Sequence, residues 1–283
     1  MYISVKMLPL FRKKIYLCKK KVMLEFITWN FEPRIFPNSN IHVAWYGLCF
    51  ALGVYFCYEF VRYTFKREGY SEELFGKVSL WLIIALIVGA RLGHCLFYEP
   101  RYYLTHPLEI LMTWKGGLAS HGAAVALPLT VFLLGRKYKF SWVWLMDRLV
   151  IGVAIAGCCI RIGNFFNSEI YGIETTLPWG VIFERNGETV PKHPTQIYEA
   201  LMCLITFVVL FFMYKKQGAK MREGLSFGLF LIMIFVFRFF VEFIKNPQVD
   251  FEVGMPLNMG QILSIPFILL GVYFLFFYKP KKV

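Results

Sequence analysis

The chain has 283 residues, a mean hydropathy of +0.54 and only 17% charged residues. Soluble domains carry about 25% charged residues, and one soluble core cannot bury so much apolar surface. The composition therefore excludes an ordinary soluble domain and predicts an all-α integral membrane protein. The seven cysteines include no C-x-x-C pair, so neither a disulfide framework nor a zinc site is indicated.

Seven apolar segments have the length needed to cross a hydrocarbon core, roughly 17–25 residues. They cover residues 43–61, 78–98, 117–135, 141–160, 195–214, 224–243 and 260–278. We therefore expect a single domain of seven transmembrane helices over residues 23–283. Between the fourth and fifth segments, turn-forming residues predict a small extracytoplasmic cap over about residues 165–193, with a hairpin at Asn186-Gly187.

The net charge of +13 could suggest nucleic-acid binding, but the basic residues gather in short clusters at the ends of apolar segments. Each cluster follows the first, third, fifth or seventh segment, and the positive-inside rule assigns all four to the cytoplasm. This predicts a multi-pass protein with its N-terminus outside and its C-terminus in the cytoplasm, in contact with membrane lipid rather than nucleic acid. The clusters are Arg62/Lys66/Arg67, Arg136/Lys137/Lys139, Lys215/Lys216/Lys220/Arg222 and Lys279/Lys281/Lys282.

Residues 1–22 break this pattern, because their many basic side chains would lie outside. No long apolar stretch or small-residue cleavage site follows those charges, so a signal peptide is not favoured. We interpret residues 1–22 as a basic N-terminal extension and expect translation to start at Met23.

A polar run over residues 161–169 closes the fourth apolar segment, where desolvating such groups is costly unless they are paired or form a site. Arg161 and Asn164 are three residues apart and share a helix face. Arg161 could hold a phosphate with its planar guanidinium, and Glu169 could orient that arginine or a polar ligand. The alternative is a structural Arg161–Glu169 pair that closes the helix.

The sixth segment carries Arg238 and Glu242, four residues apart in wholly apolar surroundings. They could simply satisfy each other, or face a wet cavity in the bundle. Because Arg238 and Arg161 should lie at similar depth on the outer side, two guanidiniums meeting there predict an anion site. The abundant anion in a membrane is a phospholipid phosphate.

The third segment opens with a glycine-rich run, residues 116–122, which includes Gly117 and His121. An imidazole can act as a general base near neutral pH, although a lone membrane histidine can also bond to a neighbouring helix. Gln196 and Glu199 share a helix face near the outer membrane boundary. Further polar residues are also candidates for the site. They are Tyr46, Arg91, His193 and Gln196.

Seven motifs occur in order along residues 25–278: W-Y-G-L at 45–48, G-A-R-L-G at 89–93, G-G-L-A-S-H-G at 116–122, R-I-G-N-F-F-N-S-E at 161–169, H-P-T-Q-I-Y-E at 193–199, F-R-F-F-V-E-F at 237–243 and M-G-Q-I-L-S-I-P at 259–266. Together they resemble the phosphatidylglycerol–prolipoprotein diacylglyceryl transferases. Ile160 and Ala123 depart from the glycines usual in that family, and Lys115 stands where an acidic residue can occur. These departures change the side chains beside Arg161, His121 and Gly116 but remove no chemical group.

The resemblance implies an enzyme of the bacterial cytoplasmic (inner) membrane that carries out the first step of lipoprotein maturation. Such an enzyme moves the diacylglyceryl group of phosphatidylglycerol to the lipobox cysteine of a secreted prolipoprotein and releases glycerol phosphate. It implies no metal and no cofactor. The partners would be phosphatidylglycerol and lipobox signal peptides.

The resemblance also suggests roles for the polar residues. Arg161 and Arg238 would grip the phosphate, oriented by Glu169 and Glu242. His121 would deprotonate the thiol or bind the glycerol head group. Other residues would contact the substrates, namely Tyr46, Arg91, Gly117, Asn164, Asn167, His193 and Gln196.

Two other classes would also place polar groups in a membrane. A transporter or channel is disfavoured because the polar groups gather on the outer side and no internal duplication is evident. An intramembrane protease would need a Ser–His pair or paired aspartates, and the adjacent Ser120 and His121 do not face each other on a helix.

Overall fold

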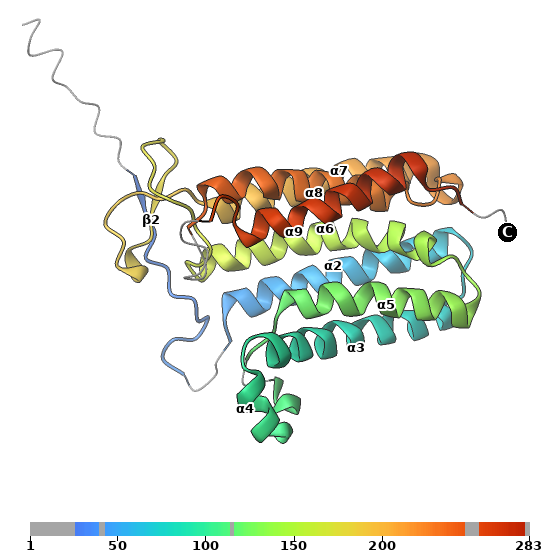
Figure 1. Cartoon of the computed structure of the whole chain (residues 1–283), viewed down its shortest axis with the longest axis horizontal. Helices are drawn as coiled ribbons and strands as arrows, with labels where there is room; N and C mark the ends of the chain where they lie inside the picture. Colours follow the sequence, from blue (N-terminus) through green and yellow to red (C-terminus); the bar gives the residue numbers. More distant parts are fainter. Residues whose placement is uncertain (1–25, 40–42, 114–115, 247–254, 281–283) are drawn as a thin grey trace, which may run out of the picture.

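The computed structural model describes residues 26–39, 43–113, 116–246 and 255–280 (Figure 1). The expected basic extension, residues 1–22, lies outside these described residues. Figure 1 shows long helices running side by side along the longest axis of the molecule. The fold is all-helical apart from one very small sheet.

Seven long helices form the bundle within the described residues, and successive ones run in opposite directions (Figure 1). Their bounds are α2 (Trp45–Arg67), α3 (Glu72–Phe97), α5 (Ser120–Tyr138), α6 (Trp142–Phe166), α7 (Thr195–Gln217), α8 (Leu225–Val241) and α9 (Met259–Val272). A π-helical turn, η7 (Tyr273–Phe277), extends α9. Each long helix coincides with one of the seven apolar segments expected from the sequence.

Several helix ends differ from the expected segments by three to six residues, and two of these differences have clear physical reasons. The first helix continues six residues beyond residue 61 to Arg67, because long basic side chains can extend a helix out of the apolar layer. The third helix begins at Ser120 rather than residue 117, because Gly116 and Gly117 adopt positive φ angles of 88° and 72°. A backbone in that region cannot belong to a right-handed helix.

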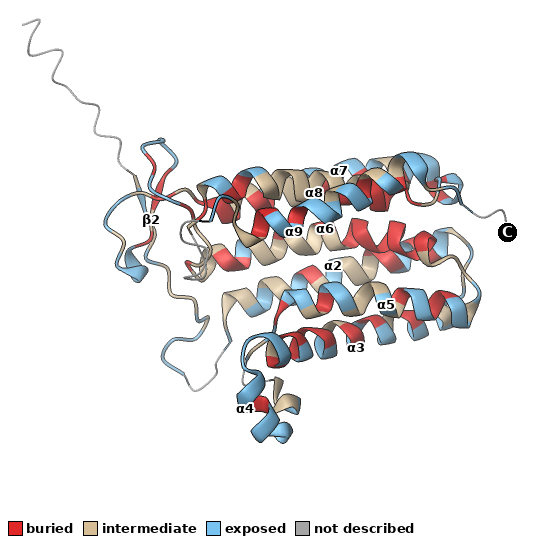
Figure 2. Cartoon of the chain, in the orientation of Figure 1, coloured by how far each residue is buried: buried red, intermediate tan, exposed pale blue. Residues whose placement is uncertain are grey.

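Five of the helices are long and apolar enough to cross a membrane, namely α3, α6, α7, α8 and α9 in the part of the chain that the structure describes. Large apolar side chains such as Val125 and Leu269 are exposed. Exposed positions recur along the long helices (Figure 2). Burying them in lipid removes the cost of exposing them to water. The chain is a multi-pass membrane protein.

Helix α6 is the centre of the packing, because α2, α7 and α8 all pack against it. Helix α3 packs closely on α5, where Gly89 and Gly93 of α3 meet Gly122 of α5. A Cβ at Gly93 would lie 2.7 Å from Cα of Gly122, so these glycines permit an approach that any larger residue would prevent. The helix that begins near His121 is thereby fixed relative to α3.

The ends of α2, α6 and α8 meet in a buried polar cluster at the end of the bundle that also holds the C-terminus. Nε and Nη2 of Arg148 each lie 3.0 Å from a carboxylate oxygen of Glu68. The carboxylate of Asp147 accepts the backbone N–H groups of Gly224 and Phe227 at 2.7 and 2.8 Å, which caps α8. These charged groups are fully partnered, which supports a structural role.

The opposite end carries the small elements. Strand β1 (Ile27–Thr28) pairs in parallel with β2 (Val181–Ile182), and α4 (Pro100–Thr105) and η1 (Pro107–Leu111) form an arm between α3 and α5 (Figure 1). The expected hairpin is instead a 3₁₀ turn, η3 (Glu184–Asn186), which Gly187 ends at φ 75°. Because only an isolated bridge joins Val181 to Lys192 across this turn, no hairpin ladder forms among the described residues.

Candidate functional site

Arg161 lies near the end of α6, at the same end of the bundle as β2. Its Nε is 3.3 Å from Oε2 of Glu199 on α7, and its Nη1 lies 3.4 Å from Oδ1 of Asn164. The alternative of a direct Arg161–Glu169 pair is not formed among the described residues, where Glu199 contacts the guanidinium instead.

Glu169 instead binds two amides that follow the same helix end. Its Oε1 accepts from Nδ2 of Asn164 at 2.7 Å and from Nδ2 of Asn167 at 3.4 Å. Asn164 thus bridges Arg161 and Glu169, so the acidic group acts on the arginine through the amide. The shared face expected for Arg161 and Asn164 is confirmed by this contact.

The turn that presents Glu169 is strained. Ser168 and Ile170 have φ angles of 55° and 60°, a region that costs energy for a β-branched residue such as isoleucine. Three side chains from other segments bind the carbonyls of this turn. Asn186 binds that of Ser168 and Gln196 that of Glu169, both at 2.6 Å, and Thr195 binds that of Ile170 at 2.8 Å.

These bonds explain how the turn keeps its conformation. Gln196 and Thr195 are completely buried at the start of α7, and both donate into the turn. Strain of this kind persists only where surrounding groups over-determine the backbone. The described contact of Gln196 is therefore with the backbone that carries Glu169.

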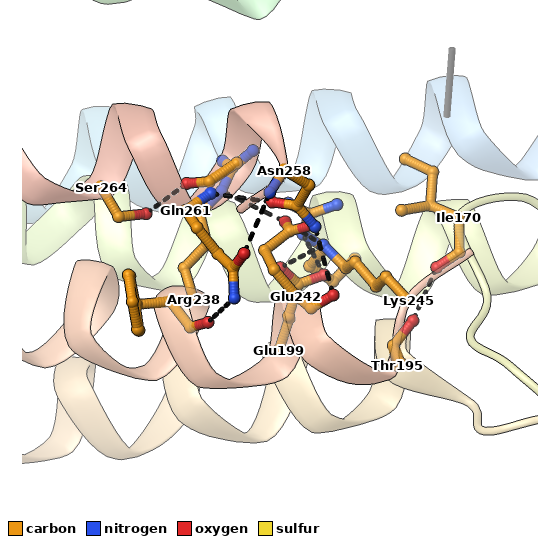
Figure 3. Close-up of polar contacts among 12 residues, drawn as sticks. Ile170, Thr195, Glu199, Arg238, Glu242, Lys245, Asn258, Gln261 and Ser264 are labelled. Atoms are coloured by element: carbon orange, nitrogen blue, oxygen red, sulfur yellow. Dashed lines mark hydrogen bonds and ion pairs between the residues drawn. The ribbon is translucent and has the colours of Figure 1, made fainter. Parts of the chain in front are cut away.

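Arg238 and Glu242 form the expected pair near the end of α8. Nε of Arg238 lies 3.5 Å from Oε1 of Glu242. The same oxygen also accepts from Nζ of Lys245 at 2.9 Å, and Lys245 binds Oε1 of Glu199 at 2.9 Å (Figure 3). A continuous network of alternating charges therefore joins Arg161 to Arg238.

The start of α9 completes this network. Asn258 caps that helix, and its Nδ2 also donates to Oε2 of Glu242 at 3.2 Å (Figure 3). The side chain of Gln261 returns to the backbone N–H of Asn258 in a capping box. The cap thus determines which oxygen of Glu242 faces the basic groups.

Burial divides the network into an inner and an outer part. The side chains of Lys245, Glu199 and Glu242 are 2%, 7% and 7% exposed, whereas those of Arg161 and Arg238 are 21% and 35% exposed. The carboxylates and the lysine therefore form a buried base from which two guanidiniums reach an accessible surface. Two such groups can bind a phosphate with several charge-assisted hydrogen bonds.

Tyr46 lies beside this cluster at the start of α2. A Cβ at Gly163 would lie 3.0 Å from the Tyr46 ring, so the missing side chain at Gly163 lets the ring pack against α6. This contact lies within one turn of both Arg161 and Asn164. The structure thus brings together eight of the expected residues, either directly or through Glu199 and Lys245. They are Tyr46, Arg161, Asn164, Asn167, Glu169, Gln196, Arg238 and Glu242.

Arg91 and Gly117 lie elsewhere, where the arm meets α3. The buried guanidinium of Arg91 donates to the backbone carbonyls of Ile110, Glu109, Gly116 and Gly117. It also lies 5.0 Å from the centre of the Tyr103 ring. These contacts indicate that Arg91 holds the arm, while direct binding of substrate by Arg91 stays a prediction.

Gly117 has a steric reason to be glycine. Its φ is 72°, and a Cβ there would meet the His94 ring and the Arg91 guanidinium. His121 is exposed at the start of α5, a turn beyond Gly117. No hydrogen bond or ion pair joins His121 to Arg161 or Arg238 among the described residues.

His193 lies in an apolar pocket between α7 and α8, and no hydrogen bond or ion pair joins it to Arg161 or Arg238 among the described residues. Its Nδ1 is 3.2 Å from the hydroxyl of Tyr198, which also accepts from Nε1 of Trp179 at 2.8 Å. Burial lowers the pKa of His193 below its ordinary value. The neutral ring is therefore favoured at this position.

Sequence reasoning missed Lys245 and Asn258. Lys245 follows an apolar segment on the side away from the basic clusters, and that isolated charge was a signal that could have identified it. Asn258, three residues before Gln261, is typical of a helix cap. Glu199 was noted for its helix face, but its pairing with Arg161 depends on how α6 and α7 pack.

The chain was compared with known proteins. The family model described as prolipoprotein diacylglyceryl transferase matches residues 33–277. A phosphatidylglycerol–prolipoprotein diacylglyceryl transferase of Bacteroides fragilis is 43% identical over 272 residues, covering 92% of this chain and 98% of the relative. Transferases of the same name from Tolumonas auensis and Porphyromonas gingivalis are both 42% identical, covering 90% and 88% of this chain and 98% and 93% of the relatives.

Proposed function

The chain belongs to the prolipoprotein diacylglyceryl transferase family, and we propose that it transfers the diacylglyceryl group of phosphatidylglycerol to the lipobox cysteine of prolipoproteins. This is the first step of lipoprotein maturation. The observation that carries the proposal is the pair of partly exposed arginines, Arg161 and Arg238, joined through one buried network at one end of the bundle.

The reaction is a displacement at carbon. The cysteine sulfur attacks the glyceryl carbon that bears the phosphate ester, an S–C bond forms, and the C–O bond to the phosphate breaks. Glycerol phosphate leaves with the electron pair of that bond, and the thiol proton passes to a base. The step needs a thiolate as the nucleophile and stabilisation of the negative charge on the leaving phosphate.

Arg161 and Arg238 supply that stabilisation in this account. Nη1 of Arg161 makes only a 3.4 Å contact with Asn164, and Arg238 contacts Glu242 through Nε. Both arginines can therefore direct outer N–H groups toward a phosphate. Glu199 and Glu242 hold the inner sides of the guanidiniums, and Asn164, Asn167 and Tyr46 donate hydrogen bonds to the head group.

His121 is proposed as the base that takes the thiol proton. Its position at the start of α5, exposed and near the glycine-rich run, leaves the ring free to meet a peptide. Arg91 supports this segment by donating to the carbonyls of Gly116 and Gly117, and both Arg91 and Gly117 are proposed to contact substrate there. His193 is proposed to contact substrate on the α7–α8 side, and Gln196 acts by holding the turn of Glu169.

The membrane topology is also a proposal. We infer that all seven long helices cross the bacterial inner membrane as one domain over residues 23–283. The N-terminus would lie outside, the C-terminus in the cytoplasm, and residues 165–193 would form an extracytoplasmic cap. Support comes from the alternating helix directions and from basic residues at the ends of α2, α5 and α7, all on the side of the C-terminus (Figure 1).

The test uses purified protein in detergent with phosphatidylglycerol and a lipobox peptide. Mass spectrometry should detect one diacylglyceryl group on the peptide cysteine and none on a peptide with serine in its place. Absence of transfer by well-folded protein would contradict the function and return the transporter class to consideration.

A further inference from the structure

Lys245 is the one described residue that binds the carboxylates of both arginine pairs. Its Nζ lies 2.9 Å from Oε1 of Glu199 and 2.9 Å from Oε1 of Glu242 (Figure 3). Glu199 comes from α7 and Glu242 from the turn after α8, so Lys245 links two separate elements. Its side chain is only 2% exposed, so the ammonium group is committed to these two partners.

The distances rank the partners of each carboxylate. Both carboxylates make their short contact with Lys245, at 2.9 Å, and their longer contacts with the arginines, at 3.3 Å for Arg161 and 3.5 Å for Arg238. Among the described residues, neither Oε2 of Glu199 nor Nε of Arg238 has a hydrogen bond of good geometry. The arginines are therefore held loosely, and the lysine holds the carboxylates tightly.

The charges of the five network residues lead to the same conclusion. Within these five residues, two arginines and one lysine face two carboxylates, so one positive charge is left over. Glu169 is not part of this count, because its carboxylate binds the amides of Asn164 and Asn167 and reaches Arg161 only through Asn164. A phosphodiester head group carries a single negative charge and would match it. Without Lys245 the two carboxylates would neutralise the two arginines and draw them inward, away from the accessible surface.

We propose that Lys245 is a positioning residue that binds Glu199 and Glu242, loosens their hold on Arg161 and Arg238, and so leaves both guanidiniums free to bind phosphate. The inference rests on the proposed function, in which that phosphate belongs to phosphatidylglycerol. It assigns a role in the site to a residue that does not itself reach the surface.

The test compares three variants with the wild type. Lys245→Met keeps the length of the side chain and removes its charge, whereas Lys245→Arg keeps the charge. The double variant Lys245→Met/Glu199→Gln removes one cation and one carboxylate together. The matched control is Lys192→Met, because Lys192 is a buried lysine with two acidic partners, Glu174 and Glu188, outside the network.

Two readouts separate this inference from the proposed function. Binding of glycerol phosphate is measured by thermal shift in detergent, and this readout reports on the anion site without turnover. Steady-state transfer gives KM for phosphatidylglycerol and kcat. Failure of the wild type to transfer, with glycerol phosphate binding still dependent on Lys245, would reject the function and keep the role of Lys245 in the anion site.

Lys245→Met should weaken glycerol phosphate binding and raise KM by at least about tenfold, since removing one partner of a buried charge network is costly. Lys245→Arg and the double variant should stay within about threefold of the wild type, because both retain the surplus positive charge. Lys192→Met should leave both readouts unchanged.

Unchanged anion binding in Lys245→Met would overturn the proposal. If that variant does not fold, the double variant decides instead. Binding within about threefold of the wild type supports the proposal, and a loss of about tenfold or more contradicts it, because a purely structural lysine would not be rescued by removing a carboxylate.

Discussion

Nε of Arg161 on α6 lies 3.3 Å from Oε2 of Glu199 on α7. Because Glu199 contacts the guanidinium at Nε, the remaining N–H groups of Arg161 are available on the side away from this carboxylate. Through Glu199 the arginine is also connected to Lys245 and to the pair formed by Glu242 and Arg238. The position of the Arg161 guanidinium therefore depends on Glu199 of α7 and on Glu242 and Lys245, which follow α8.

Arg161→Lys should lower transfer by about a hundredfold, because one ammonium cannot replace a planar guanidinium that contacts both Glu199 and phosphate. The thermal midpoint should change little, since the side chain is partly exposed and the charge is kept. Transfer of diacylglyceryl to a lipobox peptide measures the first effect. Wild-type activity in this variant would show that the shape of the guanidinium is not used.

Gln196→Met should lower both stability and transfer. The side chain is completely buried and donates to the carbonyl of Glu169 at 2.6 Å, so its loss leaves that carbonyl without this donor and releases the strained turn. The cost should be about 1–3 kcal/mol, measured by thermal unfolding in detergent.

Thr206→Val is the matched control for this change. Thr206 is equally buried on the same helix, but its hydroxyl bonds only to the carbonyl of Met202 in its own helix. It should lose less stability and keep its transfer activity. Equal losses of transfer in both variants would argue against a special role for the turn at Glu169.

Gly93→Ala should destabilise the protein by about 1–3 kcal/mol, because a Cβ there would lie 2.7 Å from the backbone of Gly122. Gly76→Ala is the control on the same helix. A Cβ at Gly76 meets nothing within 4 Å, so the alanine should stabilise α3 by about 0.5–1 kcal/mol. Unfolding by a denaturing detergent would compare them, and similar changes would contradict the close packing of α3 on α5.

The pKa of His193 leads to a prediction about acid stability. Burial lowers this pKa in the folded protein, so the unfolded chain binds the proton more readily below the ordinary value of 6.5. Stability should therefore fall as the pH drops through 6.5 and be insensitive to this residue above it. The difference in thermal unfolding midpoint between the wild type and His193→Gln should be measured at several pH values. It should change below pH 6.5, and a difference that stays constant with pH would contradict this prediction.

The sequence was sufficient for the all-helical membrane fold, because apolar length is a local property. Each of the seven expected segments overlaps one long helix. The exact ends of the helices were harder to predict from the sequence. A positive φ at Gly117 or a basic helix end at Arg67 depends on local backbone geometry rather than on hydropathy.

The site was less predictable than the fold. The pair of Arg238 and Glu242 follows from helix spacing, and the structure confirms it. The pairing of Arg161 with Glu199 does not follow from helix spacing, because the two residues are 38 positions apart along the chain. They meet only through the packing of α7 on α6. Lys245 lies only three residues from Glu242, but its contact with Glu199, 46 residues away, depends on the same kind of packing.

The most direct test of the central claim is transfer by Arg238→Ala with phosphatidylglycerol and a lipobox peptide, followed by mass spectrometry. The control is Arg136→Ala, a basic residue at the end of α5 remote from the site. We predict that Arg136→Ala retains transfer and that folded Arg238→Ala loses it by about a hundredfold or more. Full transfer by Arg238→Ala would contradict the claim that two arginines bind the leaving phosphate.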